Sequence, residues 1–310
     1  LERDQQGIGN RYRYNDWSSP VIKTGTVSGT PYSIADVLRD GTNPSSPGSI
    51  TYVSGYDGAT GPPIQLSEYW MYKFADAPDG DYSSWQQIGS TGSLNSGEGF
   101  LMKGTGDPGS PDQNYVFVGK PNNGDVSVSV SGTNDYLVGN PYPSAIDSKK
   151  FILDNGPTGT ASITGTIYYW EHYGGDTHIL ADYQAGYATY SLAGGVLATA
   201  HPSVSSIGSA TKMPQQYVPV SQGFFVQGDA DGGTIIFKNS QRIFETEASG
   251  NSIFMKANNK QKSISTEKTA DIDIDTRPKY RIGFEAPQID HRQILLTIDN
   301  NTTDMVDWGY

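Results

Sequence analysis

The sequence of 310 residues contains no cysteine and little charge, and each shortage excludes a class of protein. Without cysteine the chain can form no disulfide, no zinc–thiolate site and no cysteine nucleophile. Charged residues make up 17% of the chain, and the net charge is −12. This charge disfavours binding to nucleic-acid phosphates and to anionic lipids. No apolar run approaches the ~18 residues of a membrane-spanning helix, so we expect no membrane span.

The motifs of common enzyme sites are also missing. The sequence has no G-x-S-x-G elbow, no phosphate-binding P-loop and no H-E-x-x-H pair. The few histidines lack the spacing of a zinc pair, and we expect them to lie at the surface or in packing contacts: His172, His178, His201 and His291. A pair of catalytic carboxylates cannot be recognised among 33 acidic residues. We therefore expect no enzyme and no required cofactor.

Glycine and tyrosine are abundant, with 37 and 20 residues, and this composition is typical of strands and turns. Short apolar or alternating segments recur between clusters of Gly, Pro, Asn, Asp and Ser, as in "DVSVSVSG" at 125–132. They predict an all-β fold of tandem β-sandwich-like units, with antiparallel sheets and one or two short helices. Further strand-like segments lie at 69–74, 99–104, 115–120, 167–173, 223–228 and 233–238.

One predicted corner stands at "VGNPYPSAID", residues 138–147. Proline donates no ladder hydrogen bond, so Pro141 ends the preceding strand. Tyr142 either packs over the strand ends or faces outward, and we favour packing. Ser144 is predicted to cap a short helix that ends near Asn155. The segment "YSIADVLRDG" repeats this pattern with Ser33 as the cap.

A weak internal repeat divides the chain. Pro20 matches Pro141, and Gly99 matches Gly223, at spacings of about 120 residues. We interpret this as a tandem duplication. The alternative is that strands and turns with similar sequence patterns arose independently in the two halves. The predicted organisation has four parts: a first β unit at 1–133, a second, duplicated unit at 134–255, a polar linker or flexible hairpin at 256–278, and strands at 279–310.

The last of these parts either completes the preceding unit or belongs to a further, incomplete module, because two strands cannot form a core alone. The chain begins at Leu1 without a signal peptide. We therefore expect it to be a mature fragment or a piece of a larger protein.

Clustered aspartates form the candidate metal sites. Asp76, Asp79 and Asp81 lie around a glycine in "DAPDGDY", and calcium prefers several oxygen ligands from one flexible loop. Asp229 and Asp231 form a weaker second candidate, and Asp107 and Asp112 lie in another turn. None of these loops has the closing glutamate of an EF-hand, and Asp is also common in turns that bind no metal.

Aromatic side chains are the candidate ligand contacts. Trp70, Trp85 and Trp170 lie in tyrosine-rich strands, where aromatic faces could stack on sugar rings. The alternative is that these rings fill or cover the core of a sandwich, which is the commoner role of aromatic residues in strands.

A family resemblance rests on several segments, of which "GNPYPSAID" is the most specific. The others include "YNDWSSPV", "IYYWEHY", "VPVSQGFFVQ", "IFKNSQR" and "TTDMVDWGY". Together, over about 12–245 and 279–310, they resemble the large adhesin-like surface proteins that Bacteroidota export through the type IX secretion system, some linked to gliding motility. The upstream repetitive modules and the C-terminal sorting domain of such proteins are not in this sequence.

The resemblance implies a secreted or cell-surface protein attached to the bacterial outer membrane. It implies a non-catalytic structural or adhesive role, with other modules of the same long protein as partners and a surface glycan or protein as a ligand. The alternative is a carbohydrate-binding module of a secreted polysaccharide-degrading system. The family assigns no catalytic residue that could be carried over to this chain.

Overall fold

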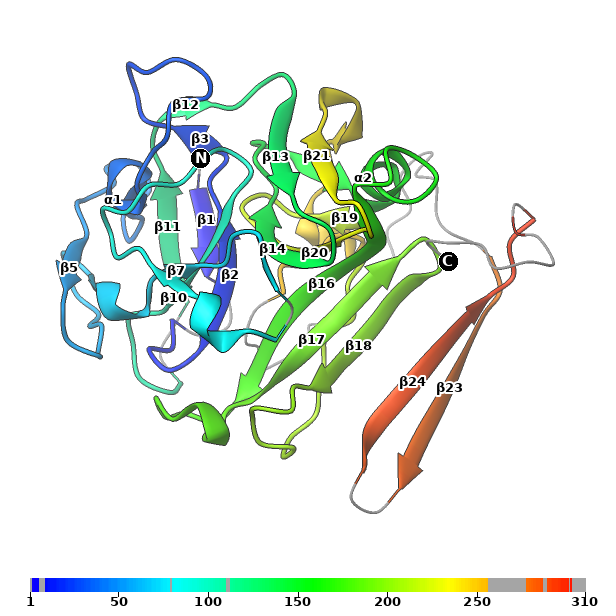
Figure 1. Ribbon diagram of the computed structural model, residues 1–310. Coiled ribbons are helices and arrows are strands. Elements are labelled where there is room, and N and C mark those ends of the chain that lie inside the picture. The colour runs from blue at the N-terminus through cyan, green and yellow to red at the C-terminus, as the bar shows by residue number, and fades with distance from the viewer. Residues whose placement is uncertain are drawn as a thin grey trace.

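The computed structural model describes residues 2–5, 9–78, 80–109, 112–255, 277–286, 289–300 and 302. In these residues, strands in mainly antiparallel sheets form most of the regular structure, together with two short α-helices, which confirms the predicted all-β fold (Figure 1). None of the described helices combines the length and the apolar character needed to cross a bilayer.

The first unit consists of a four-stranded sheet in the order β2-β10-β7-β9, a three-stranded sheet β1-β11-β4, and the pairs β12-β3 and β5-β6. Its core contains Trp17, Phe100, Tyr115 and Phe117, all fully buried. The elements are β1 (Glu2–Gln5), β2 (Tyr14–Ser18), β3 (Val21–Ile22), α1 (Ile34–Val37), β4 (Leu38–Asp40), β5 (Thr51–Val53), β6 (Gln65–Ser67), η1 (Glu68–Trp70), β7 (Tyr72–Lys73), η2 (Tyr82–Ser84), β9 (Gln86–Gln87), β10 (Gly99–Lys103), β11 (Gln113–Phe117) and β12 (Lys120–Pro121).

The second unit consists of a six-stranded sheet in the order β18-β17-β16-β20-β14-β8, a three-stranded sheet β19-β15-β22, and the pair β13-β21. Its core is a separate cluster that includes Tyr142, Phe151, Phe224 and Phe237. The elements are β8 (Ala77–Pro78), β13 (Val126–Val130), β14 (Asn134–Gly139), β15 (Ala145–Asp147), α2 (Ser148–Asn155), β16 (Ile163–Gly174), η3 (Leu180–Asp182), β17 (Gln184–Ser191), β18 (Gly194–Ala200), β19 (Tyr217–Val218), β20 (Gly223–Gly228), β21 (Gly233–Phe237), η4 (Asn239–Gln241), β22 (Arg242–Ile243) and η5 (Glu247–Ser249).

Several strand pairings of the first unit have a counterpart in the second. In the first unit β2 pairs with β10, so that Ser18 lies opposite Gly99. In the second unit β14 pairs with β20, so that Gly139 lies opposite Gly223. The pairs β1-β11, β3-β12 and β7-β10 likewise have counterparts in β13-β21, β15-β22 and β16-β20. The duplication that would explain this repetition stays our interpretation, as do the limits of the parts.

One strand lies on the other side of the expected boundary at residue 133. β13 precedes that boundary, yet it pairs with β21, and its Val128 and Val130 pack in the core of the second unit. The predicted linker lies almost wholly outside the described residues, since 256–276 are not described.

The two units contact each other reciprocally through their equivalent strands. Ser18 donates its backbone N–H to Ser221, and Gly139 donates its own to Gly97. A Cβ added to Gly99 would lie 2.7 Å from the carbonyl oxygen of Val138 in β14. One added to Gly223 would lie 2.8 Å from the backbone of β2. These glycines therefore allow backbone to pack directly on backbone between the units.

We predict that Gly99→Ala and Gly223→Ala each lower the free energy of unfolding by about 1–3 kcal/mol or more, because the added methyl group would force packed backbones apart. Urea denaturation measures this change. Gly55→Ala is the matched control, since a Cβ at Gly55 meets no atom within 4 Å. Equal stabilities for the three variants would contradict the prediction.

The predicted corner is present, but its helix begins later than expected. Residues 145–147 form β15, and α2 begins at Ser148 with Asp147 as its N-cap, so the prediction that Ser144 caps the helix is wrong. Ile146 pairs with Val218 on one side and with Arg242 on the other, and these sheet contacts hold the segment extended. The helix ends at Asn155, as predicted.

Two other predictions about these segments agree with the structure. Ser33 caps α1, and a capping box joins it to Asp36. Tyr142 packs in the core with no exposed surface, and its hydroxyl donates to the carbonyl of Gly124 at 2.7 Å.

The corrected cap gives a second prediction. The Asp147 carboxylate accepts hydrogen bonds from the backbone of Lys149 and Lys150. We expect Asp147→Ala to lower the free energy of unfolding by about 1 kcal/mol, the usual effect of a lost N-cap. Ser144→Ala should cost less, because the Ser144 hydroxyl contacts Arg242 and no helix N–H. Urea denaturation of the two variants compares them directly, and a larger loss for Ser144→Ala would refute the assignment.

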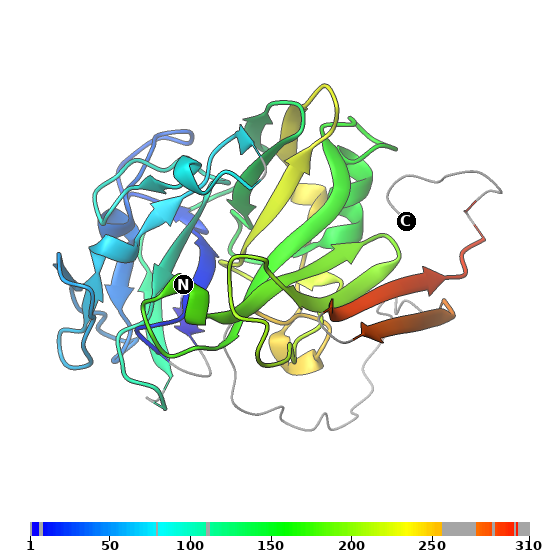
Figure 2. The same ribbon diagram turned by 60° about the horizontal axis from the view of Figure 1, so that its bottom comes forward.

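A hairpin of β23 (Lys279–Ala286) and β24 (Ile289–Thr297) follows the second unit. Figures 1 and 2 both place it next to β18, at the side of the molecule. Polar side chains hold it there: Arg281 donates to the carbonyl of Gly195 at 2.7 Å, and Thr297 to that of Ala193 at 2.8 Å. Its other face is apolar and more than half exposed, with Tyr280, Ile282, Phe284, Ile294, Leu296 and Ile298.

Candidate functional site

The three predicted tryptophans lie in different surroundings. Trp85 packs against Phe74 and Phe225 and covers a small apolar cluster, and Trp170 lies against Tyr187. Trp85 thus has the covering role that the sequence left as the alternative, and Trp170 contacts Tyr187, which packs against the same cluster. Trp70 alone lies within an exposed group of aromatic side chains.

The two described residues of the first calcium candidate, Asp76 and Asp81, each have other hydrogen-bond partners. Asp76 accepts hydrogen bonds from the backbone and the hydroxyl of Ser131, at 2.6 and 2.7 Å. Asp81 caps η2, and hydrogen bonds from Ser83 and Ser84 lower its pKa. Asp79 lies outside the described residues.

In the second candidate, Asp229 accepts from the N–H of Ala230 at 2.8 Å, and Asp231 is exposed. Among the described residues, no three His, Asp or Glu side chains gather closely enough to hold a metal ion. Calcium binding stays a prediction.

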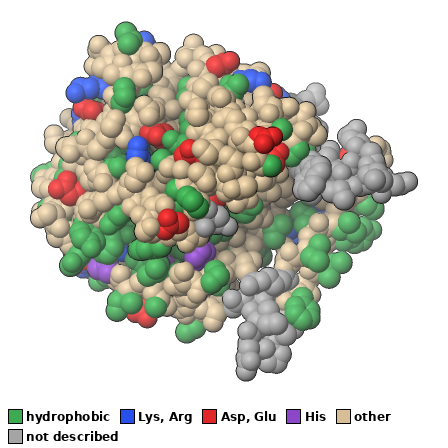
Figure 3. All heavy atoms as spheres, in the orientation of Figure 1, with side chains coloured by type: hydrophobic (Ala, Val, Ile, Leu, Met, Phe, Trp, Pro, Cys, Tyr) green, Lys and Arg blue, Asp and Glu red, His purple; other side chains and the backbone are tan. Residues whose placement is uncertain are grey.

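Tyr56, Tyr69 and Trp70 form what we call the aromatic surface. The ring centroids of Tyr56 and Tyr69 are 4.7 Å apart and the rings are nearly perpendicular, at 86°. Trp70 lies against both, with centroids 5.8 and 4.7 Å away. Tyr56 is 57% exposed and Tyr69 is 37% exposed. Figure 3 shows hydrophobic and histidine side chains close together on one face of the molecule. Large aromatic rings thus face solvent in a fixed mutual orientation.

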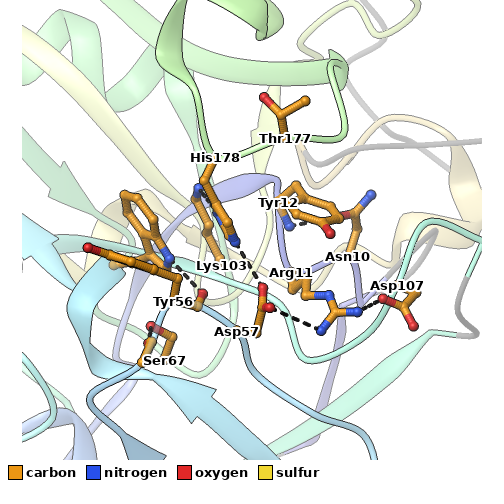
Figure 4. Close-up of polar contacts among 12 residues, drawn as sticks. Asn10, Arg11, Tyr12, Tyr56, Asp57, Ser67, Lys103, Asp107, Thr177 and His178 are labelled. Carbon is orange, nitrogen blue, oxygen red and sulfur yellow. Dashed lines mark hydrogen bonds and ion pairs between the residues drawn. The ribbon is translucent and has the colours of Figure 1, made fainter.

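Local hydrogen bonds fix the loop that carries Tyr56. This loop connects β5 to β6, which pair in parallel, and η1 with Tyr69 and Trp70 follows β6 directly. The Trp70 indole N–H donates to the carbonyl of Tyr56 at 2.8 Å, and the Ser67 hydroxyl donates to that of Gly55 at 2.5 Å. Figure 4 shows this arrangement. The loop is therefore ordered before any ligand binds, which lowers the entropy cost of binding.

Lys103 lies directly beneath the aromatic surface and is only 3% exposed. Its ammonium nitrogen is 3.7 Å from the centre of the Trp70 ring and 4.6 Å from that of Tyr14. It donates to the hydroxyl of Tyr183 at 2.7 Å and lies 3.0 Å from Nδ1 of His178. Burial lowers the pKa of Lys103 to about 7. Cation–π contacts hold a buried lysine against a cluster of rings.

A chain of polar contacts runs from Lys103 to the surface. His178 stacks on Trp70, and its Nε2 lies 2.9 Å from the Asp57 carboxylate (Figure 4). Burial lowers the pKa of His178, and a neutral ring that accepts from the Lys103 ammonium at Nδ1 carries its hydrogen at Nε2, where it can donate to Asp57. Arg11 pairs with Asp57 at 3.5 Å and also with Asp107. These contacts hold Asp57 in place and add to the hydrogen bonds that fix the loop carrying Tyr56.

The contacts of Lys103 decide what the site can do chemically. A lysine with a pKa near 7 is a potential nucleophile, and a histidine lies beside it. However, Trp70, Tyr14 and Tyr183 surround the amine and shield it from solvent. The arrangement instead suits Lys103 to holding the rings in place.

An open hollow of about 360 Å³ has Tyr69 in its wall. It is lined by Ser54, Glu68, Tyr69, Gln87, Ile88, Gly89 and Thr91. The Gln87 amide donates to the carbonyl of Tyr69 at 2.9 Å, and Glu68 accepts from the hydroxyl of Ser90 at 2.8 Å. The hollow therefore combines one aromatic wall with hydroxyl, amide and carboxylate groups.

Sequence reasoning found Trp70 but missed its neighbours. His178, which we expected at the surface or in packing, connects Lys103 to Asp57. The available signal was local: "SGYDG" is an exposed turn, and "EYWMY" follows it with three aromatic residues. Nothing in the sequence indicated that Lys103 would contact residues of the second unit.

The site and fold together define a class: an all-β chain of repeated antiparallel units with an exposed, preorganised aromatic surface. The chain belongs to a family described as a domain of unknown function, DUF8693, whose model matches residues 52–310. This match includes the aromatic surface and the second unit. No curated protein matches the chain, and no solved structure matches it.

Two buried groups give folding stability opposite pH dependences. Burial raises the pKa of Asp16 to about 8 from 3.8, and it lowers that of Lys103 to about 7 from 10.5. The folded state thus binds the Asp16 proton more tightly than the unfolded chain does, so this contribution to stability is lost as pH rises from 3.8 to 8. The unfolded chain binds the Lys103 proton more tightly, so that contribution grows as pH rises from 7 to 10.5.

We therefore predict that the two variants Asp16→Asn and Lys103→Met change different limbs of the pH profile. The free energy of unfolding, measured with urea between pH 5 and pH 10, should fall less steeply below about pH 8 in Asp16→Asn. In Lys103→Met the rise above about pH 7 should be lost. A difference between each variant and the wild type that stayed constant with pH would contradict the prediction.

Proposed function

We propose that this chain is a non-catalytic, adhesive region of a secreted or cell-surface protein of the Bacteroidota, and that it binds a glycan through the aromatic surface. The observation that carries the glycan ligand is the pair of exposed tyrosines, Tyr56 and Tyr69, held in a fixed orientation by Trp70. Aromatic rings contribute large contact areas at low entropy cost, and sugar rings stack on them.

The surroundings of the rings support a sugar more than a bare protein contact. Asp57 is half-exposed beside Tyr56, and Glu68 and Gln87 lie beside Tyr69 in the hollow. Convergent polar groups around an apolar wall are the usual composition of a small-molecule site. Carboxylate and amide oxygens can accept hydrogen bonds from sugar hydroxyls, while the rings contact the C–H faces of the sugar.

The adhesive role and the location rest on other observations. They rest on the resemblance of "GNPYPSAID" and its companion segments to exported surface proteins, and on a cysteine-free, acidic composition. The proposed partners are the other modules of the same long surface protein. The second candidate, a carbohydrate-binding module of a secreted polysaccharide-degrading system, uses the same aromatic surface and differs only in the modules attached to it.

A glycan array tests the proposal. We expect the chain to bind a limited set of glycans, and we expect Tyr56→Ala and Tyr69→Ala each to weaken binding by about tenfold, the effect of losing a stacking contact of about 1.4 kcal/mol. The control is Tyr280→Ala in the hairpin, since Tyr280 is 56% exposed and Tyr56 is 57% exposed. Circular dichroism of each variant checks the fold.

Two outcomes would count against the proposal. An array without any glycan hit would favour adhesion through protein contacts alone. Hits that Tyr56→Ala and Tyr69→Ala leave unchanged would place glycan binding elsewhere on the molecule.

A further inference from the structure

Carboxylates are the charged groups that face solvent next to the aromatic surface. The side chain of Asp57 is 54% exposed, and that of Asp107 is 67% exposed. Asp176, which lies close by on the second unit, is 34% exposed. A ligand approaching this face first meets negative charge and aromatic rings.

The cations of the same region lie below these carboxylates and are already paired. Arg11 is 23% exposed and pairs with Asp57 and Asp107, and Arg13 is 8% exposed and pairs with Asp176. Lys103 is buried under Trp70, with the Tyr183 hydroxyl and His178 as its polar contacts. Each cation thus holds neighbouring side chains in place and is poorly placed to bind an anionic ligand.

The hollow beside Tyr69 is likewise lined by a carboxylate and by no cationic side chain. Its lining contains the Glu68 carboxylate, the Gln87 amide and the hydroxyls of Ser54 and Thr91, but no lysine or arginine. Its volume of about 360 Å³ lies at the lower end of the range for small-ligand pockets. This volume fits the end of a glycan rather than a long segment of one.

We infer that the aromatic surface and this hollow select neutral glycans over acidic ones, with Tyr69 as the wall against which the sugar in the hollow stacks. The inference rests on the proposed glycan-binding function and adds the class of ligand. Neutral sugars offer hydroxyl donors to Asp57 and Glu68, and charge-assisted hydrogen bonds of this kind are the stronger ones. A uronate or sulfate would instead meet those carboxylates, with no exposed cation of the site to offset the repulsion.

The test is affinity electrophoresis in native gels that contain one polysaccharide each. The neutral probes are galactomannan, xyloglucan and laminarin, and the acidic probes are alginate, polygalacturonate and chondroitin sulfate. We expect retardation by at least one neutral polymer and by none of the acidic ones, at low salt and at physiological salt. Titration calorimetry with the retarding polymer then gives the affinity.

Three variants locate the selectivity. Tyr69→Ala should weaken neutral-glycan binding about tenfold, and Tyr280→Ala should leave it unchanged. Thr91→Lys places a cation in the hollow, so we expect it to gain measurable retardation by an acidic polymer at low salt. That gain should fade as salt rises, because salt screens exposed charges.

The outcomes separate the two proposals. Binding of acidic polymers by the wild type, lost in Tyr69→Ala, would overturn the neutral selectivity and leave glycan binding intact. Neutral binding that Tyr69→Ala does not alter would overturn the assignment of the hollow. Binding to no polymer and to no array glycan would overturn the proposed function itself.

Discussion

Direct packing of backbone on backbone between the two units is the constraint on which the rest of the structure depends. β2 and β10 of the first unit meet β14 and β20 of the second, and the contacts are reciprocal: the N–H of Ser18 is bonded to Ser221 as that of Gly139 is to Gly97. A side chain at Gly99 or Gly223 would separate the units, since each glycine lies against the other unit's backbone. Such a self-complementary contact resembles the interface of a twofold-symmetric dimer, here formed within one chain.

The candidate site depends on this contact because both units contribute to it. Lys103 ends β10 and lies opposite Tyr14 of β2, whereas its polar contacts, His178 and Tyr183, belong to the second unit. The equivalent positions of the β14-β20 pair are Gln227 and Asp135. A glutamine and an aspartate cannot make the cation–π contacts of Lys103 with its rings. The repeated frame is thus similar in both units, but of the two equivalent pairs only β2-β10 carries these groups.

The sequence predicted what local rules govern. Alternating strands, glycine-rich turns and the Ser33 capping box all depend on neighbours within a few residues, and the structure contains them. The prediction that Ser144 caps the helix was wrong because the local sequence pattern could not reveal the sheet partners of Ile146. These partners lie on both sides of it, in β19 and β22. The site was missed for a related reason: Lys103 meets its partners at separations of 75 and 80 residues. Trp70 could be found, since aromatic residues crowd around it in the sequence, but the contacts that expose Tyr56 could not.

Burying Lys103 opposes folding. This energetic cost indicates that the residue has a role other than stabilising the fold. Desolvation lowers its pKa, so at neutral pH the chain loses stability that an apolar side chain would not cost. Within the site its cation–π and hydrogen-bond contacts hold Trp70, Tyr183 and His178 around one point. Trp70 in turn binds the carbonyl of Tyr56, and His178 binds Asp57, so the exposed Tyr56 and Asp57 of the loop are both positioned through the buried amine. A local breach of packing rules of this kind is expected at functional sites, where an otherwise costly group fixes the position of others.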